Sequence, residues 1–224
     1  MACAWSLTRQ PEAFEVEVWE ALAVTGGVAS TVAVGAEGVE INDQVQGGAP
    51  SYRNNLLFFE EFGHLPHPVH LRVAFGTGPL AWTNHSDSAL VRRLAPEIAR
   101  FGRVLKWIYR LEAAFAFVPI ASVLRWCSFS EEFRNAMVFP LTALFFGTGN
   151  QTPAVSAAVV ARVFLDPKLR LFQYSDTRLL DSVPDMFAFP KLGAVFADIA
   201  ARIPAVVRTG GAAAGGPPGW GSAA

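Results

Sequence analysis

The chain has 224 residues and a mass of 24.1 kDa, which is enough for one large domain or two small ones. Hydrophobic residues make up 52% of it, and 18 Lys and Arg stand against 19 Asp and Glu, for a formal net charge of -1. This balance argues against a nucleic-acid-binding protein, which needs a basic surplus to neutralise phosphates, and the totals give no sign of attraction to a membrane surface.

The cysteines and the first residues bear on the cellular compartment. Cys3 and Cys127 lie far apart in different surroundings, so we expect neither a disulfide framework nor a cysteine zinc site. Charged residues begin at Arg9, before any sustained apolar segment, and a secretory signal is therefore not expected. These features favour a cytoplasmic protein, with import into an organelle left open.

The N-terminal segment predicts a helix and then a strand. Ala2 to Arg9 is interpreted as a helix that ends before Pro11, because proline disfavours helix at the residue before it. From Phe14 to Trp19 the side chains alternate in the period-two pattern of a half-buried strand. Glu20 directly follows this strand, and the pair Gly26-Gly27 comes six residues later.

Short strands and a helix are predicted next. Val28 to Val34 and Gly38 to Ile41 are interpreted as two short strands or a hairpin around Gly35. Ser51 to Phe62 has the apolar spacing of a helix, and Gly63 is placed to end it.

The middle of the chain is predicted to be mainly helical. Residues 64 to 82, rich in Pro and Gly, suit a strand and turns. Asp87 to Trp126 carries an apolar stripe at three- and four-residue steps, with charges largely on the other side. Further helices are predicted to begin at Ser128 to Ser130, where a serine can cap the first amides, and at Thr152-Pro153.

The uncharged run from Ala136 to Ala161 is long enough to cross a membrane. Prolines and glycines interrupt its middle, so we interpret it as two buried helices and expect no transmembrane span. Leu169 to Tyr174 is predicted to be a strand, and Leu192 to Ile203 the last helix. From 208 to 224 the chain has the Gly-, Ala- and Pro-rich composition of a flexible tail.

Met1 to Thr31, taken as one unit, resembles the flavin-dependent amine-oxidase-like superfamily of FAD/NAD(P)-binding oxidoreductases. In that superfamily a strand-ending Glu is followed by Arg-x-Gly-Gly-Arg and then by Ser or Thr, a segment that wraps the FAD diphosphate. The two arginine positions are Val24 and Val28 here, so charge-assisted contacts to phosphate are not expected from them. Four residues fit the pattern: Glu20, Gly26, Gly27 and Thr31.

The resemblance implies a cofactor, a binding site and a reaction. The Glu20 carboxylate would accept hydrogen bonds from the adenosine ribose hydroxyls, and Gly26, Gly27 and Thr31 would lie at the phosphates of FAD. The implied chemistry is hydride transfer from a small-molecule substrate to the flavin, and the aromatic side chains of the helical part point to an apolar substrate. The resemblance assigns no catalytic acid or base.

Two later parts of the chain look similar to a subgroup of these oxidoreductases. The subgroup carries a Pro-Thr-Tyr-Pro-Asn stretch that opens a helix, and Pro50 to Asn54 looks like that stretch. Its helical cap looks similar to Ser128 to Phe133 and to Phe139 to Ala143. The implied fold class is α/β, with a partial Rossmann-like FAD-binding domain and a helix-rich substrate cap.

The expected domain organisation follows from this resemblance. Residues 1–50 are expected to form the partial dinucleotide-binding segment, residues 51–207 a mostly helical cap with short strands, and residues 208–224 the tail. The glycine-rich turn that precedes such a segment is expected upstream of Met1, and the sequence lacks both this turn and the C-terminal part of such proteins.

Other interpretations stay open from the residues alone. An acidic residue after a strand and a nearby Gly-Gly pair also occur together by chance. The alternative function is a noncatalytic fragment that acts as a protein-interaction module, with self-association through an incomplete sheet.

Two further groups of residues are interpreted as structural. The histidines at positions 64, 67 and 70 are expected in a loop and not at a metal site, because Pro66 and Pro68 interrupt the helix that would align them. Six aromatic residues are expected to pack in a core and not to line a substrate tunnel. They are Trp107, Tyr109, Phe115, Phe117, Trp126 and Phe129.

Overall fold

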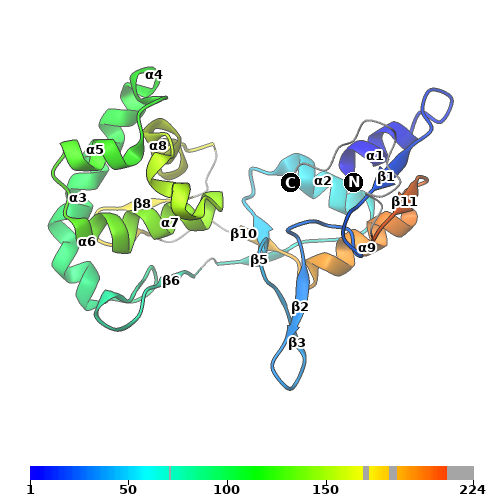
Figure 1. The fold of residues 1–224 in the computed structure, drawn as a ribbon, viewed down its shortest axis with the longest axis horizontal. Helices are drawn as coiled ribbons and strands as arrows, with labels where there is room; N and C mark the ends of the chain where they lie inside the picture. Colours follow the sequence, from blue (N-terminus) through cyan, green and yellow to red (C-terminus); the bar gives the residue numbers. More distant parts are fainter. Residues whose placement is uncertain (71, 169–171, 182–185, 211–224) are drawn as a thin grey trace. The chain divides into compact units, whose positions relative to one another are not determined.

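A computed structural model describes residues 1–70, 72–168, 172–181 and 186–210 (Figure 1). The chain divides into two compact units. The first unit comprises Met1–Gly48, Tyr52–Pro68 and the described part of Phe187–Ala224. The second comprises Ala49–Ser51 and Val69–Met186. Segments from both ends of the chain therefore build the first unit.

The first unit combines helices with short strands. Strands β5 (His67–Val69) and β10 (Met186–Ala188) each extend one residue beyond the limits of this unit. They form a three-stranded sheet with β4, in the order β4-β10-β5. The other elements are α1 (Ala2–Thr8), β1 (Glu17–Trp19), β2 (Thr31–Val34), β3 (Val39–Asn42), β4 (Gly47–Gly48), α2 (Arg53–Glu61), α9 (Leu192–Arg202) and β11 (Val206–Arg208).

Strand β1 pairs in parallel with β11, so that Glu17 lies opposite Val206 and Trp19 opposite Arg208. The predicted strand is confirmed but is shorter than expected from its alternating pattern, which starts at Phe14. The Phe14 amide donates to the Gln10 carbonyl in a turn, and β11 supplies only three residues for pairing. The alternating pattern thus extends beyond the length over which a partner strand is present.

The predicted hairpin around Gly35 and the helix that follows are confirmed. Strands β2 and β3 pair antiparallel, with Val34 opposite Val39. Helix α2 ends at Glu61, and Gly63 follows its C-cap Phe62 with a φ of +77°, in the left-handed region that glycine adopts without strain. The His64 amide then donates to the Phe59 carbonyl at 3.0 Å and closes the helix end.

An aromatic core holds the helices of the first unit together. The Trp5 ring of α1 packs edge-on against Phe58, with ring centroids 5.7 Å apart. The Phe59 ring lies 4.8 Å from Phe189 and 5.8 Å from Phe196 of α9. Such edge-to-face pairs add to the burial of apolar area, so α1, α2 and α9 share one interior.

The second unit is mainly helical. Its long helix α3 (Ala89–Arg110) begins at Ser88, whose hydroxyl accepts from the Val91 amide at 3.2 Å. The remaining helical elements are α4 (Glu112–Phe115), α5 (Ile120–Trp126), α6 (Glu131–Phe133), α7 (Phe139–Phe146) and α8 (Ala157–Leu165), with the 3-10 turns η1 (Gly78–Leu80) and η3 (Gly149–Ala154) and the π-helix η2 (Arg134–Val138). Two-residue strands pair as β6 (Ala74–Phe75) with β7 (Trp82–Thr83) and β8 (Tyr174–Ser175) with β9 (Leu179–Leu180).

One face of α3 forms the centre of this unit, as its apolar stripe predicts. Leu90, Leu94, Ile98, Phe101 and Leu105 are all buried on it. Helix α8 packs along α3, and its own buried side chains complete the core. The predicted serine cap is also confirmed, because the Ser130 hydroxyl accepts from the Phe133 amide at 3.1 Å.

The side chains of Tyr174 and Trp82 form partly buried hydrogen bonds with helix backbone in this core. The Tyr174 hydroxyl accepts from the Gly102 amide at 3.0 Å and donates to the Ile98 carbonyl, so it joins two backbone groups of α3. Burial of the side chain raises the pKa of Tyr174 above its usual value. The indole nitrogen of Trp82, which is 2% exposed, donates at 2.8 Å to the Ala136 carbonyl in η2.

The run from Ala136 to Ala161 forms two main helices, α7 and α8, as predicted. The helix start predicted at Thr152-Pro153 is wrong, because these residues lie in the 3-10 turn and α8 begins at Ala157. Proline suits the first turn of either helix type, and the sequence did not distinguish them. In the part of the chain that the structure describes, no helix is long and apolar enough to span a membrane.

The fold class α/β is confirmed in that helices and strands are mixed throughout the chain. Residues 169–171 of the strand predicted from Leu169 to Tyr174 lie outside the described residues, and β8 begins at Tyr174. Residues 211–224 of the predicted tail also lie outside them.

Candidate functional site

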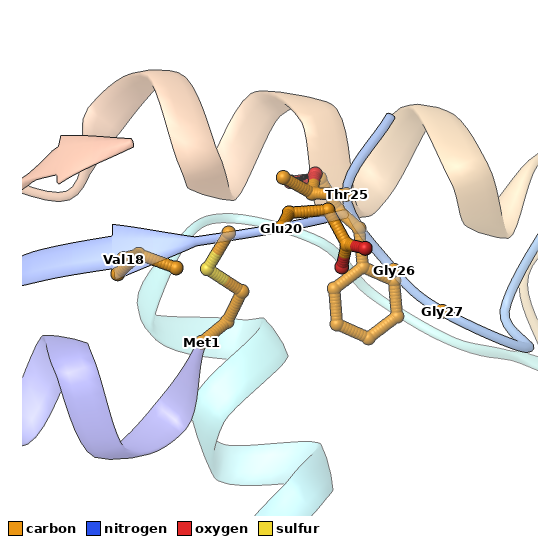
Figure 2. Close-up of a pocket in the computed structure, with 7 residues that line it drawn as sticks. Met1, Val18, Glu20, Thr25, Gly26 and Gly27 are labelled. Carbon is orange, nitrogen blue, oxygen red and sulfur yellow. Dashed lines mark hydrogen bonds between the residues drawn. The ribbon is translucent and has the colours of Figure 1, made fainter. Parts of the chain in front are cut away.

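A pocket of about 200 Å³ lies at the carboxyl end of β1, within the first unit (Figure 2). Residues from both ends of the chain line it. They are Met1, Val18, Glu20, Thr25, Gly26, Gly27 and Phe196. Three of the four residues predicted from the resemblance, Glu20, Gly26 and Gly27, are therefore brought together.

Glu20 is positioned by the parallel pairing of β1 and β11. Its amide donates to the Arg208 carbonyl at 2.8 Å, which extends the ladder one residue beyond the strand. Its carboxylate oxygen Oε1 accepts from the Leu22 amide at 3.0 Å, and this contact holds the side chain at the start of the following loop. The carboxylate is partly exposed and lies beside Gly26 and the Met1 side chain (Figure 2).

The Gly26-Gly27 turn lines the pocket beside Glu20. Both residues have positive φ, +119° and +57°, which favours glycine at each position. A Cβ atom on Gly26 would lie 3.1 Å from the Ala29 carbonyl oxygen and 3.4 Å from Cβ of Phe196. Thr25 fixes the turn to α9, since its hydroxyl donates to the Phe196 carbonyl at 3.3 Å.

Besides Glu20 and Thr25, the residues that line the pocket are apolar or glycine. Val24 and Val28, at the positions where the resembled pattern has arginine, are both exposed. Among the described residues that line the pocket there is no Lys or Arg. Any phosphate held here would therefore depend on backbone amides and not on side-chain cations.

Thr31 does not line the pocket. Its hydroxyl accepts from the Gly193 amide at 2.9 Å and donates to Oδ1 of Asn42 at 2.8 Å. The same Asn42 oxygen accepts from the Leu192 amide at 3.0 Å. Lys191, which directly precedes α9, makes no side-chain cap, so two residues of the β2–β3 hairpin cap this helix in its place.

We expect Thr31→Val to lower the free energy of unfolding by about 1 kcal/mol, the usual cost of losing a helix cap. Chemical denaturation measures this change, with Thr31→Ser as the control that keeps the hydroxyl. A substitution that leaves stability unchanged would show that the Thr31 hydroxyl does not cap α9.

Other residues considered from the sequence lie elsewhere. Lys191, which precedes α9, forms an ion pair with Glu40 of the β2–β3 hairpin. His64 Nε2 lies 2.8 Å from Oδ2 of Asp198, and this hydrogen bond, with a second from Arg202, lowers the pKa of the Asp198 carboxyl. These contacts join α9 to the hairpin and to the end of α2, which is a structural role.

Solved structures share the fold of this chain. Single, double and triple mutants of putrescine oxidase, from a redesign of its cofactor binding, match with 18% identity and TM-scores of 0.52, 0.52 and 0.51. Each match covers 92% of this chain and 47% of the putrescine oxidase chain, so the chain spans about half the length of that protein. No family model matches the chain, and no curated protein sequence matches it.

At this level of identity the match shows the fold alone. It agrees with the resemblance of residues 1–31 to the flavin-dependent amine-oxidase-like superfamily, which rests on the sequence alone. The chain therefore has an amine-oxidase-like fold over the part that it spans.

Proposed function

We propose that the chain binds FAD at the pocket beside β1 and serves as part of an FAD-dependent oxidoreductase of the amine-oxidase-like class. The observation that carries the proposal is the position of Glu20. Its carboxylate lies one residue beyond a parallel strand, at a pocket that Gly26 and Gly27 also line. An acidic side chain in this place suits the ribose hydroxyls of an adenine dinucleotide.

The pocket suits one part of the cofactor. Sites that enclose a whole small-molecule ligand have volumes of roughly 300–1,000 Å³, and the volume here is about 200 Å³. We therefore assign it to the adenosine end, with Glu20 at the ribose and the main chain of Gly26 and Gly27 at the neighbouring phosphate. When bound, FAD supplies the acceptor for two electrons and a proton.

The protein contribution from Glu20 is limited in size. A hydrogen bond to a charged group contributes about 1.5–3 kcal/mol when it is shielded from water. Because the carboxylate is partly exposed, we expect the lower part of this range. The valines at positions 24 and 28 add no charge-assisted contact, so we expect the affinity for FAD to be modest.

The reaction that this proposal implies is hydride transfer from a small-molecule substrate to the flavin. We assign the cofactor to the first unit, where Glu20 lies, and the role of substrate cap to the helical second unit. That the substrate is apolar stays a prediction, because the aromatic rings that pack around Phe101 are buried in the core of the second unit. The division at residues 50 and 207, the Rossmann-like character of the first segment and the cytoplasmic location stay predictions.

The test is a titration of the purified chain with FAD, followed by flavin fluorescence. We expect Glu20→Ala to weaken binding about tenfold, since about 1.4 kcal/mol corresponds to a factor of ten. Glu15→Ala is the matched control, because it removes an exposed carboxylate from the segment before β1. Failure to bind FAD, or an equal loss in both variants, would contradict the proposal and favour the noncatalytic interaction module.

A further inference from the structure

The C-terminal end of α3 lies next to α4 (Figure 1). The outer face of the helix at this end differs from the rest of α3 in its charged and aromatic side chains. The helix buries the face that carries Ile98, Leu105 and Ile108. Arg103 and Lys106 lie on the opposite side at the 100° spacing of an α-helix, and Trp107 and Arg110 share that side. All four side chains are exposed, so three cations and an indole form one outer face.

Aromatic side chains lie at the end of this helix and in the segment that follows it. Trp107 is 45% exposed, and its ring rests edge-on against Phe115 of α4 with centroids 4.6 Å apart. Phe117 follows in the turn after α4 and is 97% exposed, so almost none of its apolar area is buried. The interpretation of the six aromatic residues as core is wrong for four of them. Trp107, Tyr109, Phe117 and Trp126 are exposed, whereas Phe115 and Phe129 are buried.

The cations at this end of α3 have no acidic neighbour within the helix and no ion pair among the described residues. From Phe101 to Leu111 the sequence has three basic residues and no Asp or Glu. The next acid, Glu112, pairs with Arg162 at 2.7 Å. In the part of the chain with described coordinates, Arg103, Lys106 and Arg110 form no ion pair.

The arginines in the part of the same helix up to Arg100 lie close to acidic side chains. Arg93 pairs with Glu132, which raises the pKa of Arg93 through their hydrogen bond, and Arg100 lies 3.6 Å from Glu97. Arg92 likewise pairs with Asp87. Among the described residues, the arginines toward the N-terminal end of α3 are paired with acids, whereas Arg103, Lys106 and Arg110 form no ion pair. This difference exists although the net charge of the whole chain is near zero.

We propose that the basic-aromatic end of α3, made up of Arg103, Lys106, Trp107, Arg110 and Phe117, docks on an anionic lipid surface. Trp and Phe side chains enter the boundary between headgroups and acyl chains, while Lys and Arg pair with anionic headgroups. Phe117 protrudes from a turn, which suits insertion into a deformable surface better than fitting into a rigid protein groove. The proposal does not depend on the binding of FAD.

The proposal is tested by sedimentation of the full chain with lipid vesicles. We expect binding to vesicles of phosphatidylcholine with phosphatidylserine and much weaker binding to phosphatidylcholine alone. Each basic residue at an anionic surface contributes about a fivefold gain in affinity, so the triple variant R103Q, K106Q, R110Q should lose about a hundredfold. Phe117→Ser should lose about tenfold or more, since it removes the most exposed apolar side chain.

Matched controls separate this surface from general effects of charge and exposure. The triple variant R53Q, R72Q, R178Q removes the same charge from exposed positions elsewhere, and Leu65→Ser removes an exposed apolar side chain of the first unit. Both controls should bind as the unaltered chain does, and circular dichroism should show all variants folded. Equal binding to neutral vesicles, equal losses in the control variants, or preferred binding to a DNA duplex over anionic vesicles would overturn the proposal.

Discussion

Gly102→Ala should destabilise the second unit by about 3 kcal/mol, although alanine is normally the better helix former by about 1 kcal/mol. Gly102 is buried in α3 beneath the Tyr174 ring. A Cβ atom there would lie 2.5 Å from the Tyr174 hydroxyl oxygen and still closer to two ring carbons. The ring would have to move, and its hydroxyl would lose its contacts with Gly102 and Ile98.

A double-mutant cycle with Tyr174→Ala isolates this clash. In the Tyr174→Ala background the added methyl group meets no ring, so Gly102→Ala should become neutral or slightly stabilising. Urea denaturation followed by circular dichroism measures all four proteins. Equal costs of Gly102→Ala with and without the tyrosine ring would contradict the explanation.

Gly47→Ala should destabilise the first unit by more than about 3 kcal/mol, because the new atom meets backbone and not a movable side chain. Gly47 lies in β4 opposite Ala188 of β10. A Cβ atom would lie 2.8 Å from the Phe187 carbonyl carbon and 2.9 Å from Cα of Ala188, with the Phe187 oxygen nearer still. The pairing of β4 with β10 would have to break.

The neighbouring Gly48 provides the control for this prediction. A Cβ atom on Gly48 would lie 2.7 Å from Cδ2 of Tyr52 and 2.8 Å from Cζ of Phe187, which are ring atoms of side chains and not backbone. Since side chains can shift, Gly48→Ala should cost clearly less than Gly47→Ala. Thermal unfolding of both variants gives the order, and a reversed order would show that backbone crowding does not limit this sheet.

The local elements could be predicted from the sequence because their patterns are local. The apolar stripe of α3, the hairpin around Gly35 and the end of α2 before Gly63 each depend on residues within a few positions. The pairing of β1 with β11 could not be predicted. Three residues of β11 carry no distinctive pattern, and their partner strand lies near the other end of the chain.

The candidate site was predicted in part. Glu20, Gly26 and Gly27 lie at one pocket, but Phe196 and Met1 were missed because long-range packing brings them there. The resemblance places Thr31 at the cofactor phosphates, which stays a prediction, and in the structure its hydroxyl caps α9. The sequence contains one signal for this cap. Lys191, directly before the last helix, is a poor capping residue, which predicts that another part of the chain caps the helix.

The exposed aromatic residues show how composition can mislead. Tryptophan is often buried on average, and this base expectation favoured a core. Helical spacing places Trp107 on the same side of α3 as Arg103 and Arg110, opposite Ile98 and Leu105. The helical period of the sequence therefore predicts that Trp107 is exposed, whereas the density of aromatic residues wrongly predicts that it is buried.

The proposed function requires the Glu20 carboxylate to bind the ribose of an adenine dinucleotide. A crystal structure of the chain grown with FAD tests it most directly. We expect a ribose hydroxyl oxygen within hydrogen-bonding distance of Glu20 and the adjoining phosphate at the Gly26-Gly27 turn. FAD bound at another place, with the Glu20 carboxylate still held only by the Leu22 amide, would contradict the account.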